Sequence, residues 1–199
     1  MSTDPALRYV YWRFVVLGMA TLMAWNVYIT ASDFFRHEFR STFLHDNFES
    51  IFSILSNTIN LFALTYALYT QPTANNNQRI RHGLFSTVGV FIALIILPLF
   101  GIDGWLAVVV SLLALCVAAV AAAFIQCSIF GIAATLDHPC YAEGYMGGQA
   151  IAGTVASAVQ LVTVYLESEK VEDEGRVRAV GYFGVAMVFA GLSTVAWSQ

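Results

Sequence analysis

The sequence predicts an all-α integral membrane protein with six transmembrane helices, and three observations carry that prediction. The first is composition: of 199 residues, 58% are hydrophobic and only 11% are charged. Soluble domains have about 45–50% apolar and about 25% charged residues. A globule of this size leaves too much surface in water to hide so many apolar side chains. The composition therefore excludes a soluble enzyme and a disordered protein, and a net charge of −4 gives no basic excess for nucleic acid.

The second observation is the spacing of the charged residues, which separate six long apolar segments. A helix needs about 20 apolar residues to cross about 30 Å of hydrocarbon. We expect spans at about 12–34, 48–70, 83–101, 104–135, 143–166 and 178–198, forming one bundle over 14–199. Backbone polar groups in lipid must bond within their own segment, which favours helices. The third observation is that alternating stretches of about ten residues, typical of membrane strands, are absent.

The connections between the spans differ in their polarity. Residues 71–78 read QPTANNNQ and predict a polar turn after the second span, because proline and asparagine favour turns. Residues 33–49 and 167–178 carry many charges and are expected to be solvated connectors. Residues 137–140 read DHPC, a sequence typical of a turn. One histidine with one cysteine is too weak a pattern to predict a metal site.

Polar residues inside the spans carry the functional information, because an unpaired polar group in lipid is costly. Trp25 and Asn26 lie in the first span, Gln126 in the fourth and Gln149 in the fifth; Asn57 and Asn60 share one face of the second. No charged residue lies deep in a span. That pattern favours a pathway for a neutral solute, with the indole stacking on a flat ring and amides bonding its edge. Alternatively, the amides join helices to each other, at about 0.6 kcal/mol each.

Small residues form a stripe along the fifth span. Gly144, Gly148, Ala152 and Ala156 are spaced by four, and Gly153 widens the stripe. Such spacing lets two helix backbones approach closely. Two interpretations remain open at this point: a contact that slides during transport, or static tight packing.

Three motifs resemble one known family, the equilibrative nucleoside transporters. Residues 17–31 read LGMATLMAWNVYITA and resemble the family's first helix, which contains Pro-Trp-Asn and ends in Thr-Ala. Residues 126–131 read QCSIFG and are similar to Gln-Gly-Ser-x-Phe-Gly of the fourth helix. Residues 146–153 read MGGQAIAG and are similar to Met-Ser-Gly-Gln-Gly-x-Ala-Gly of the fifth. The motifs occur in the family's order and spacing, and the resemblance covers essentially the whole chain.

The resemblance implies movement of nucleosides or nucleobases by alternating access, with no enzymatic activity, cofactor or metal. It implies that residues 1–13 are cytoplasmic, an orientation that the nearly even division of Lys and Arg residues leaves open. The plasma membrane or an organelle or vacuolar membrane would hold the chain. By position, the resemblance suggests substrate-binding roles for Trp25, Asn26, Gln126, Leu61 and Leu64, and it matches Gly148 and Gly153 to glycines that pack the family's fifth helix. Together with the spacing by four, the helix-packing set is Gly144, Gly148, Ala152, Gly153 and Ala156.

The sequence departs from the family pattern in composition and in extent. Ala24 replaces the proline before Trp-Asn, and Cys127 replaces a glycine. Members have eleven helices, as six plus five, so this chain resembles only the N-terminal six-helix bundle of a major-facilitator-like transporter. We therefore expect transport to need a partner: a C-terminal half, a full-length relative or a second copy of the chain. The alternative is a non-transporting membrane protein that binds or regulates a full-length transporter.

Overall fold

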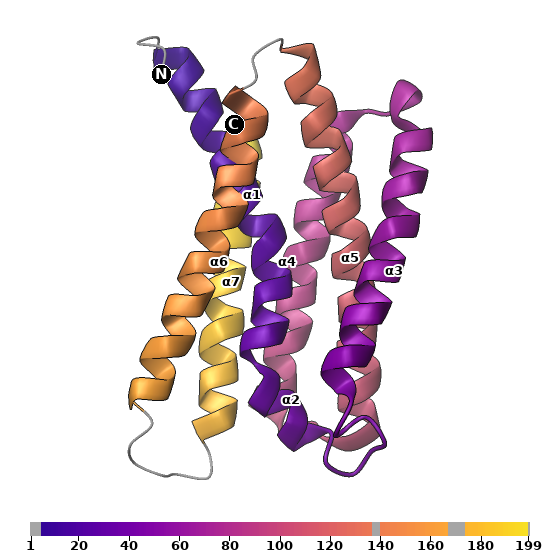
Figure 1. Cartoon of the computed structure of the whole chain (residues 1–199), viewed down its shortest axis with the longest axis vertical. Helices are drawn as coiled ribbons and strands as arrows, with labels where there is room; N and C mark the ends of the chain where they lie inside the picture. The colour runs from indigo at the N-terminus through magenta and orange to yellow at the C-terminus, as the bar shows by residue number, and fades with distance from the viewer. Residues whose placement is uncertain (1–4, 137–139, 167–173, 199) are drawn as a thin grey trace.

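Seven α-helices account for nearly all of the described chain (Figure 1). The computed structural model describes residues 5–136, 140–166 and 174–198, with side chains over 7–136, 140–162 and 179–198. The helices are α1 (Pro5–Thr30), α2 (Ser32–Glu38), α3 (Phe48–Tyr69), α4 (Asn76–Phe100), α5 (Gly104–Thr135), α6 (Cys140–Leu166) and α7 (Glu174–Ser198). Within the described residues there is no strand, so the prediction of an all-α protein is confirmed.

Five of these helices are long and apolar enough to cross a membrane, which identifies the chain as an integral membrane protein. They are α1 from Leu7, α3, α4, α5 and α7. Helix α6 has 27 residues but is not among the five. Six spans therefore remain a prediction, of which five are supported by length and composition.

Local sequence explains where α4 begins and ends. The polar turn expected after the second span is present as a short 3-10 helix, Gln71–Thr73. The Asn75 side chain then caps α4 by accepting a hydrogen bond from the Gln78 backbone N–H, at 3.1 Å. At the other end Gly101 adopts φ +61°, a left-handed conformation that glycine accommodates without steric cost.

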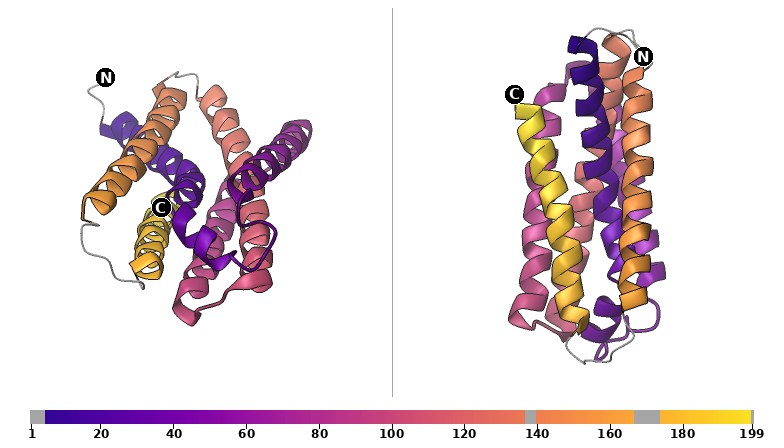
Figure 2. Two further views of the ribbon diagram at one scale, coloured as in Figure 1. Left: turned by 60° about the horizontal axis from the view of Figure 1, so that its bottom comes forward. Right: turned by 90° about the vertical axis from the view of Figure 1, so that its left-hand side faces the viewer.

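The long helices pack as a row whose two ends, α3 and α6, leave an opening. The row runs α6, α1, α7, α4, α5, α3, each helix packing on the next, and α1 also touches α5. Helices α3 and α6 are not a packed pair. Figure 2 shows this arrangement nearly end-on, with α3 and α6 on opposite sides of the bundle. The first and last described residues lie toward the same end (Figure 1), as an even number of spans requires.

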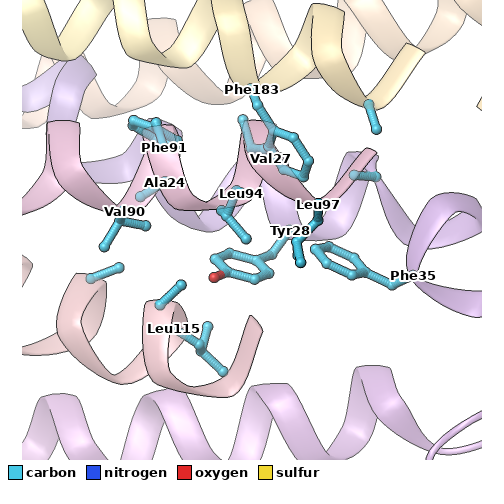
Figure 3. Packing of buried hydrophobic residues seen from close by; sticks show 14 of the residues in the cluster. Ala24, Val27, Tyr28, Phe35, Val90, Phe91, Leu94, Leu97, Leu115 and Phe183 are labelled. Carbon is cyan, nitrogen blue, oxygen red and sulfur yellow. The ribbon is translucent and has the colours of Figure 1, made fainter. Parts of the chain in front are cut away.

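The expectation that residues 33–49 form a solvated connector is wrong. The segment contains α2, and its aromatic side chains pack under the bundle although charged residues lie between them. Phe35 and Phe39 are fully buried and lie 5.6 Å apart between ring centres. Phe35 also stacks on Tyr28 of α1, at 5.5 Å, and lies beside Phe183 of α7 (Figure 3). Burial of aromatic rings outweighs the charge pattern here, because each ring removes a large apolar area from water.

Two expectations fall on residues that the structure does not describe in full. The DHPC turn lies outside the described residues except for Cys140, where α6 begins. The charged connector at 167–178 lies outside them from 167 to 173, and only the helical backbone of α7 is described from Glu174.

Candidate functional site

A cavity of about 230 Å³ lies between α1, α3, α5 and α6, at the opening between the two ends of the row. Two residues predicted to bind substrate line it together: Trp25 of α1 and Gln126 of α5. They are far apart in the sequence, and contact between α1 and α5 places them at one cavity. Every lining residue is uncharged at neutral pH. The cavity is therefore a neutral, partly aromatic and amide-rich site near mid-bundle.

Glycines set the position of the wall that α1 and α6 build. A Cβ on Gly18 would collide with the backbone carbonyl oxygen of Tyr145, and a Cβ on Gly148 would collide with that of Val15. The two helices thus touch backbone to backbone, as small residues spaced by four permit. Gly144 lies against the Tyr11 ring of α1, which a Cβ would meet at 2.9 Å. The structure shows tight packing at Gly144 and Gly148 of the small-residue stripe.

This close approach creates a polar network beside the cavity. The Tyr145 hydroxyl lies 3.1 Å from the Thr21 hydroxyl across the two helices. It also bonds the Gln149 side chain. The Thr21 hydroxyl in turn donates to the backbone carbonyl of Gly18, at 3.0 Å. Tyr145 is fully buried, so these bonds satisfy a hydroxyl that would otherwise carry a desolvation cost. The network orients Gln149 at the cavity wall.

The opposite wall comes from α3, and two asparagines form its polar part. Asn60 donates from Nδ2 to the backbone carbonyl of Ala119 on α5, at 3.1 Å. Asn57 donates to Ser53 Oγ one turn earlier on its own helix, at 3.4 Å. Both line the cavity. Asn60 therefore ties α3 to α5, while Asn57 bonds only within α3.

Gln126 differs from the other amides that line the cavity, because it forms no hydrogen bond with any described residue. It is half-buried and lines the cavity. Its amide keeps two N–H donors and a carbonyl acceptor available. Trp25 is also half-buried, so part of its ring face is accessible. The pair offers a flat aromatic surface with a free amide, the two features that bind a flat heterocycle with polar edges.

Three of the predicted binding residues do not line this cavity. Asn26 is half-buried outside it, and its Nδ2 is buried without a hydrogen-bond partner among the described residues. Leu61 is 63% exposed, and Leu64 is half-buried away from the cavity. Leu61 follows Asn60 by one position, which turns a side chain by about 100° around the helix. That rotation separates Leu61 from the cavity wall.

The remaining residues of the stripe have different surroundings. Ala152 is fully buried and belongs to the core between α1, α6 and α7. Ala156 lies one turn further toward the C-terminal end of α6, half-buried beside Val27 and Tyr182. A Cβ on Gly153 would meet no atom within 4 Å. Within the stripe, close backbone contact is therefore found at Gly148, where α1 crosses α6.

Sequence reasoning gave no role to Tyr145 and assigned no substrate contact to Asn57, Asn60 or Gln149. A signal existed for the amides, since each is a polar residue inside an apolar segment. No comparable signal marked Tyr145, because tyrosine near the end of a span is also typical of the membrane interface. Only the crossing of α1 and α6 brings its hydroxyl to Thr21.

The described residues contain no group of three or more His, Cys, Asp or Glu side chains that could hold a metal ion. The cavity lining likewise lacks carboxylates, imidazoles and thiols.

Two comparisons with known proteins found similarity to nucleoside transporters. A family model described as Nucleoside transporter matches residues 112–199, which include most of α5 and all of α6 and α7. The chain is 24% identical over 169 residues to the nucleoside transporter FUN26 of Saccharomyces cerevisiae, covering 83% of this chain and 32% of that protein. The chain thus spans about a third of the length of this curated relative. These matches show that the chain is similar to nucleoside transporters, over residues 112–199 by the family model and over 169 residues by the yeast relative.

Proposed function

We propose that this chain forms the N-terminal half of a nucleoside or nucleobase transporter and supplies one wall of its substrate site. The observation that carries the proposal is the cavity itself. It brings Trp25 and Gln126 together in a lining without charged groups. A neutral lining suits neutral solutes, because an isolated charge in such a site would be costly to desolvate.

In the proposed site each side chain has a separate task. The Trp25 ring stacks on the base, and the Gln126 amide bonds polar atoms at its edge. Asn57, Asn60 and Gln149 offer further donors and acceptors around the same cavity. Asn26 supports Trp25 from outside the cavity. Leu61 and Leu64 provide apolar surface on α3 beside it.

Alternating access requires a second bundle, because one bundle must move against another around the site. The cavity opens between α3 and α6, so its uncovered side faces the place where such a bundle would pack. A C-terminal half, a full-length relative or a second copy of the chain would complete the site. The N-terminus would be cytoplasmic, in the plasma membrane or an organelle membrane.

The first test is binding of radiolabelled adenosine and uridine to the chain in lipid nanodiscs. Stacking of a base on an aromatic ring contributes about 1–3 kcal/mol, so Trp25→Ala should weaken binding by about 5-fold to 150-fold. Loss of an amide hydrogen bond costs about 1 kcal/mol, so Gln126→Ala should weaken binding about fivefold. Trp105→Ala is the matched control, because Trp105 is 57% exposed and lies outside the cavity. Equal affinity in all four proteins would refute the assigned roles.

A second candidate function is a non-transporting protein that binds and regulates a full-length relative. The one-sided cavity favours it, because an uncovered wall is a surface on which another bundle could pack. Nucleoside uptake into liposomes, measured with the chain alone and with a co-expressed C-terminal half, separates the two. Uptake that appears only with the second half supports the transporter. Co-purification with a full-length relative, without nucleoside binding by the chain, supports the regulator.

A further inference from the structure

A second, larger cavity of about 620 Å³ forms a groove between α4 and α5. It lies on the opposite side of α5 from the candidate substrate site. Val117, Val120 and Phe124 line the groove, whereas Ala118, Ala122 and Gln126 line the substrate cavity. Positions two apart on a helix differ by about 200°, so the two sets face away from each other. The groove therefore faces outward from the bundle, toward the surrounding lipid.

The groove is polar at one end and apolar along its length. Asn75, Gln78, Arg79 and His82 line it at the start of α4, next to the turn that follows α3. The three α5 residues, two valines and a phenylalanine, form its apolar wall. That wall runs from Phe124, beside the polar end, toward the middle of the membrane segment of α5. A ligand that fits must have a polar head and an apolar body.

Arg79 carries the positive charge at the polar end, and its described bonds are all to neutral groups. Its Nη1 donates to the Ala67 carbonyl and to Gln71 Oε1, each at 3.1 Å, and Nη2 donates to Thr70 Oγ1. The guanidinium carbon lies 5.2 Å from the centre of the Phe124 ring, inside the groove. A guanidinium has five N–H donors, so these bonds leave two free.

No carboxylate among the described residues neutralises this guanidinium. The described ion pairs, His37 with Glu38 and His45 with Asp46, lie in the segment around α2 at the far end of the bundle (Figure 1). A half-buried cation at the edge of an apolar groove is stabilised by an anion that brings its own apolar surface. Basic pockets between membrane helices bind acidic lipid head groups for this reason.

We propose that this groove binds one anionic phospholipid, with its phosphate at Arg79 and His82 and an acyl chain along Val117, Val120 and Phe124. The free N–H groups of Arg79 would donate charge-assisted hydrogen bonds to the phosphate. A soluble phosphate would leave the apolar wall unused, and the groove faces lipid. The site is separate from the substrate cavity and does not depend on the transport proposal.

The test is native mass spectrometry of the full chain, purified in detergent and titrated with phosphatidylglycerol or phosphatidylcholine. One phosphatidylglycerol should remain bound at least fivefold more tightly than phosphatidylcholine. Val120→Trp fills the apolar wall and should abolish retention of the lipid. Leu113→Trp is the matched control, because Leu113 is exposed on the same helix and does not line the groove. Equal binding of both lipids, or full retention by Val120→Trp, would overturn the proposal.

Two substitutions at the polar end of the groove separate the loss of a head-group contact from misfolding of the chain. His82→Ala removes an exposed side chain of the groove and should lower phosphatidylglycerol affinity about threefold, whereas Arg81→Ala, a neighbour outside the lining, should change it less. Arg79→Gln should remove the preference for the anionic lipid. Because Arg79 also bonds the turn after α3, His82→Ala and Val120→Trp decide the outcome if Arg79→Gln does not fold. An unchanged lipid preference in folded Arg79→Gln contradicts the proposal.

Discussion

The two helices that form opposite walls of the candidate site, α1 and α3, differ in how much of their surface is buried and in how they contact their neighbours. In α1, 56% of the apolar segment is buried inside the bundle, whereas in α3 only 17% is. Helix α1 touches α6 through backbone atoms at Gly18 and Gly148. Helix α3 meets α5 through the Asn60 hydrogen bond and a ring contact between Tyr66 and Phe124.

This difference assigns separate tasks to the two helices. Contact between backbones leaves no side chain that can adjust, so the α1–α6 crossing places Trp25 and the Tyr145 network rigidly. Helix α3 presents large exposed apolar side chains instead, such as Phe62 and Tyr69. Lipid or a second bundle would cover that surface. The site thus combines a rigid wall with a wall that has few contacts within this chain.

The largest expected effect comes from adding a methyl group at the α1–α6 crossing. Gly148→Ala should lower the free energy of unfolding by about 2 kcal/mol, because its Cβ would overlap the Val15 carbonyl. The measurement is thermal unfolding in detergent. Gly147→Ala is the matched control: its Cβ meets nothing within 4 Å, so better helix propensity should raise stability by up to about 1 kcal/mol. Equal shifts in the two variants would contradict the rigid crossing.

A smaller effect is expected from removing the hydroxyl that joins α1 and α6. Tyr145→Phe should lower stability by about 1 kcal/mol, because it deletes the bonds to Thr21 and Gln149. It should also weaken nucleoside binding, since Gln149 loses its orienting partner. A double-mutant cycle with Thr21→Val measures the coupling directly. Tyr66→Phe, at an exposed tyrosine, should leave both readouts unchanged, and zero coupling in the cycle would rule the network out.

The smallest effect is expected on the α3 side. Asn60→Ala should lower stability by about 0.6 kcal/mol, the typical value for a polar contact between membrane helices. Asn57→Ala should have almost no effect, because Asn57 bonds only within its own helix. Thermal unfolding of both variants provides the comparison. If Asn60→Ala destabilised the chain as much as Gly148→Ala, the contrast between the two walls would be lost.

Much of the fold was predictable from residue type and spacing. Long apolar segments predicted helices because lipid provides no partner for backbone groups, and residues 71–78 predicted the turn before α4. The aromatic residues between 34 and 48 were misjudged, because charge density suggested solvent while five apolar side chains turn inward. A charged neighbour can point outward from the same short helix, so local composition did not decide burial.

The candidate site was only partly predictable for a related reason. Motifs on separate helices identified Trp25 and Gln126, which line one cavity. On α3, Asn60 lines the cavity whereas the predicted residue Leu61 does not, because of the way α3 is rotated about its axis against α5. Periodicity defines a face of a helix but not the neighbour that the face meets. In the same way, spacing by four did not distinguish Gly148, in tight contact, from Gly153, in open space.

The sequence by itself determined that this protein is helical, lies in a membrane and carries motifs that resemble those of nucleoside transporters. Those properties follow from composition, hydrophobic segment length and short motifs, which are local. Only the tertiary structure decided which amides share a cavity and which glycines set the distance between α1 and α6. It also decided that α5 separates a neutral cavity from a groove in which Arg79 bonds neutral groups. Such relations join residues distant in the chain, and they depend on helix rotation and crossing, which packing determines.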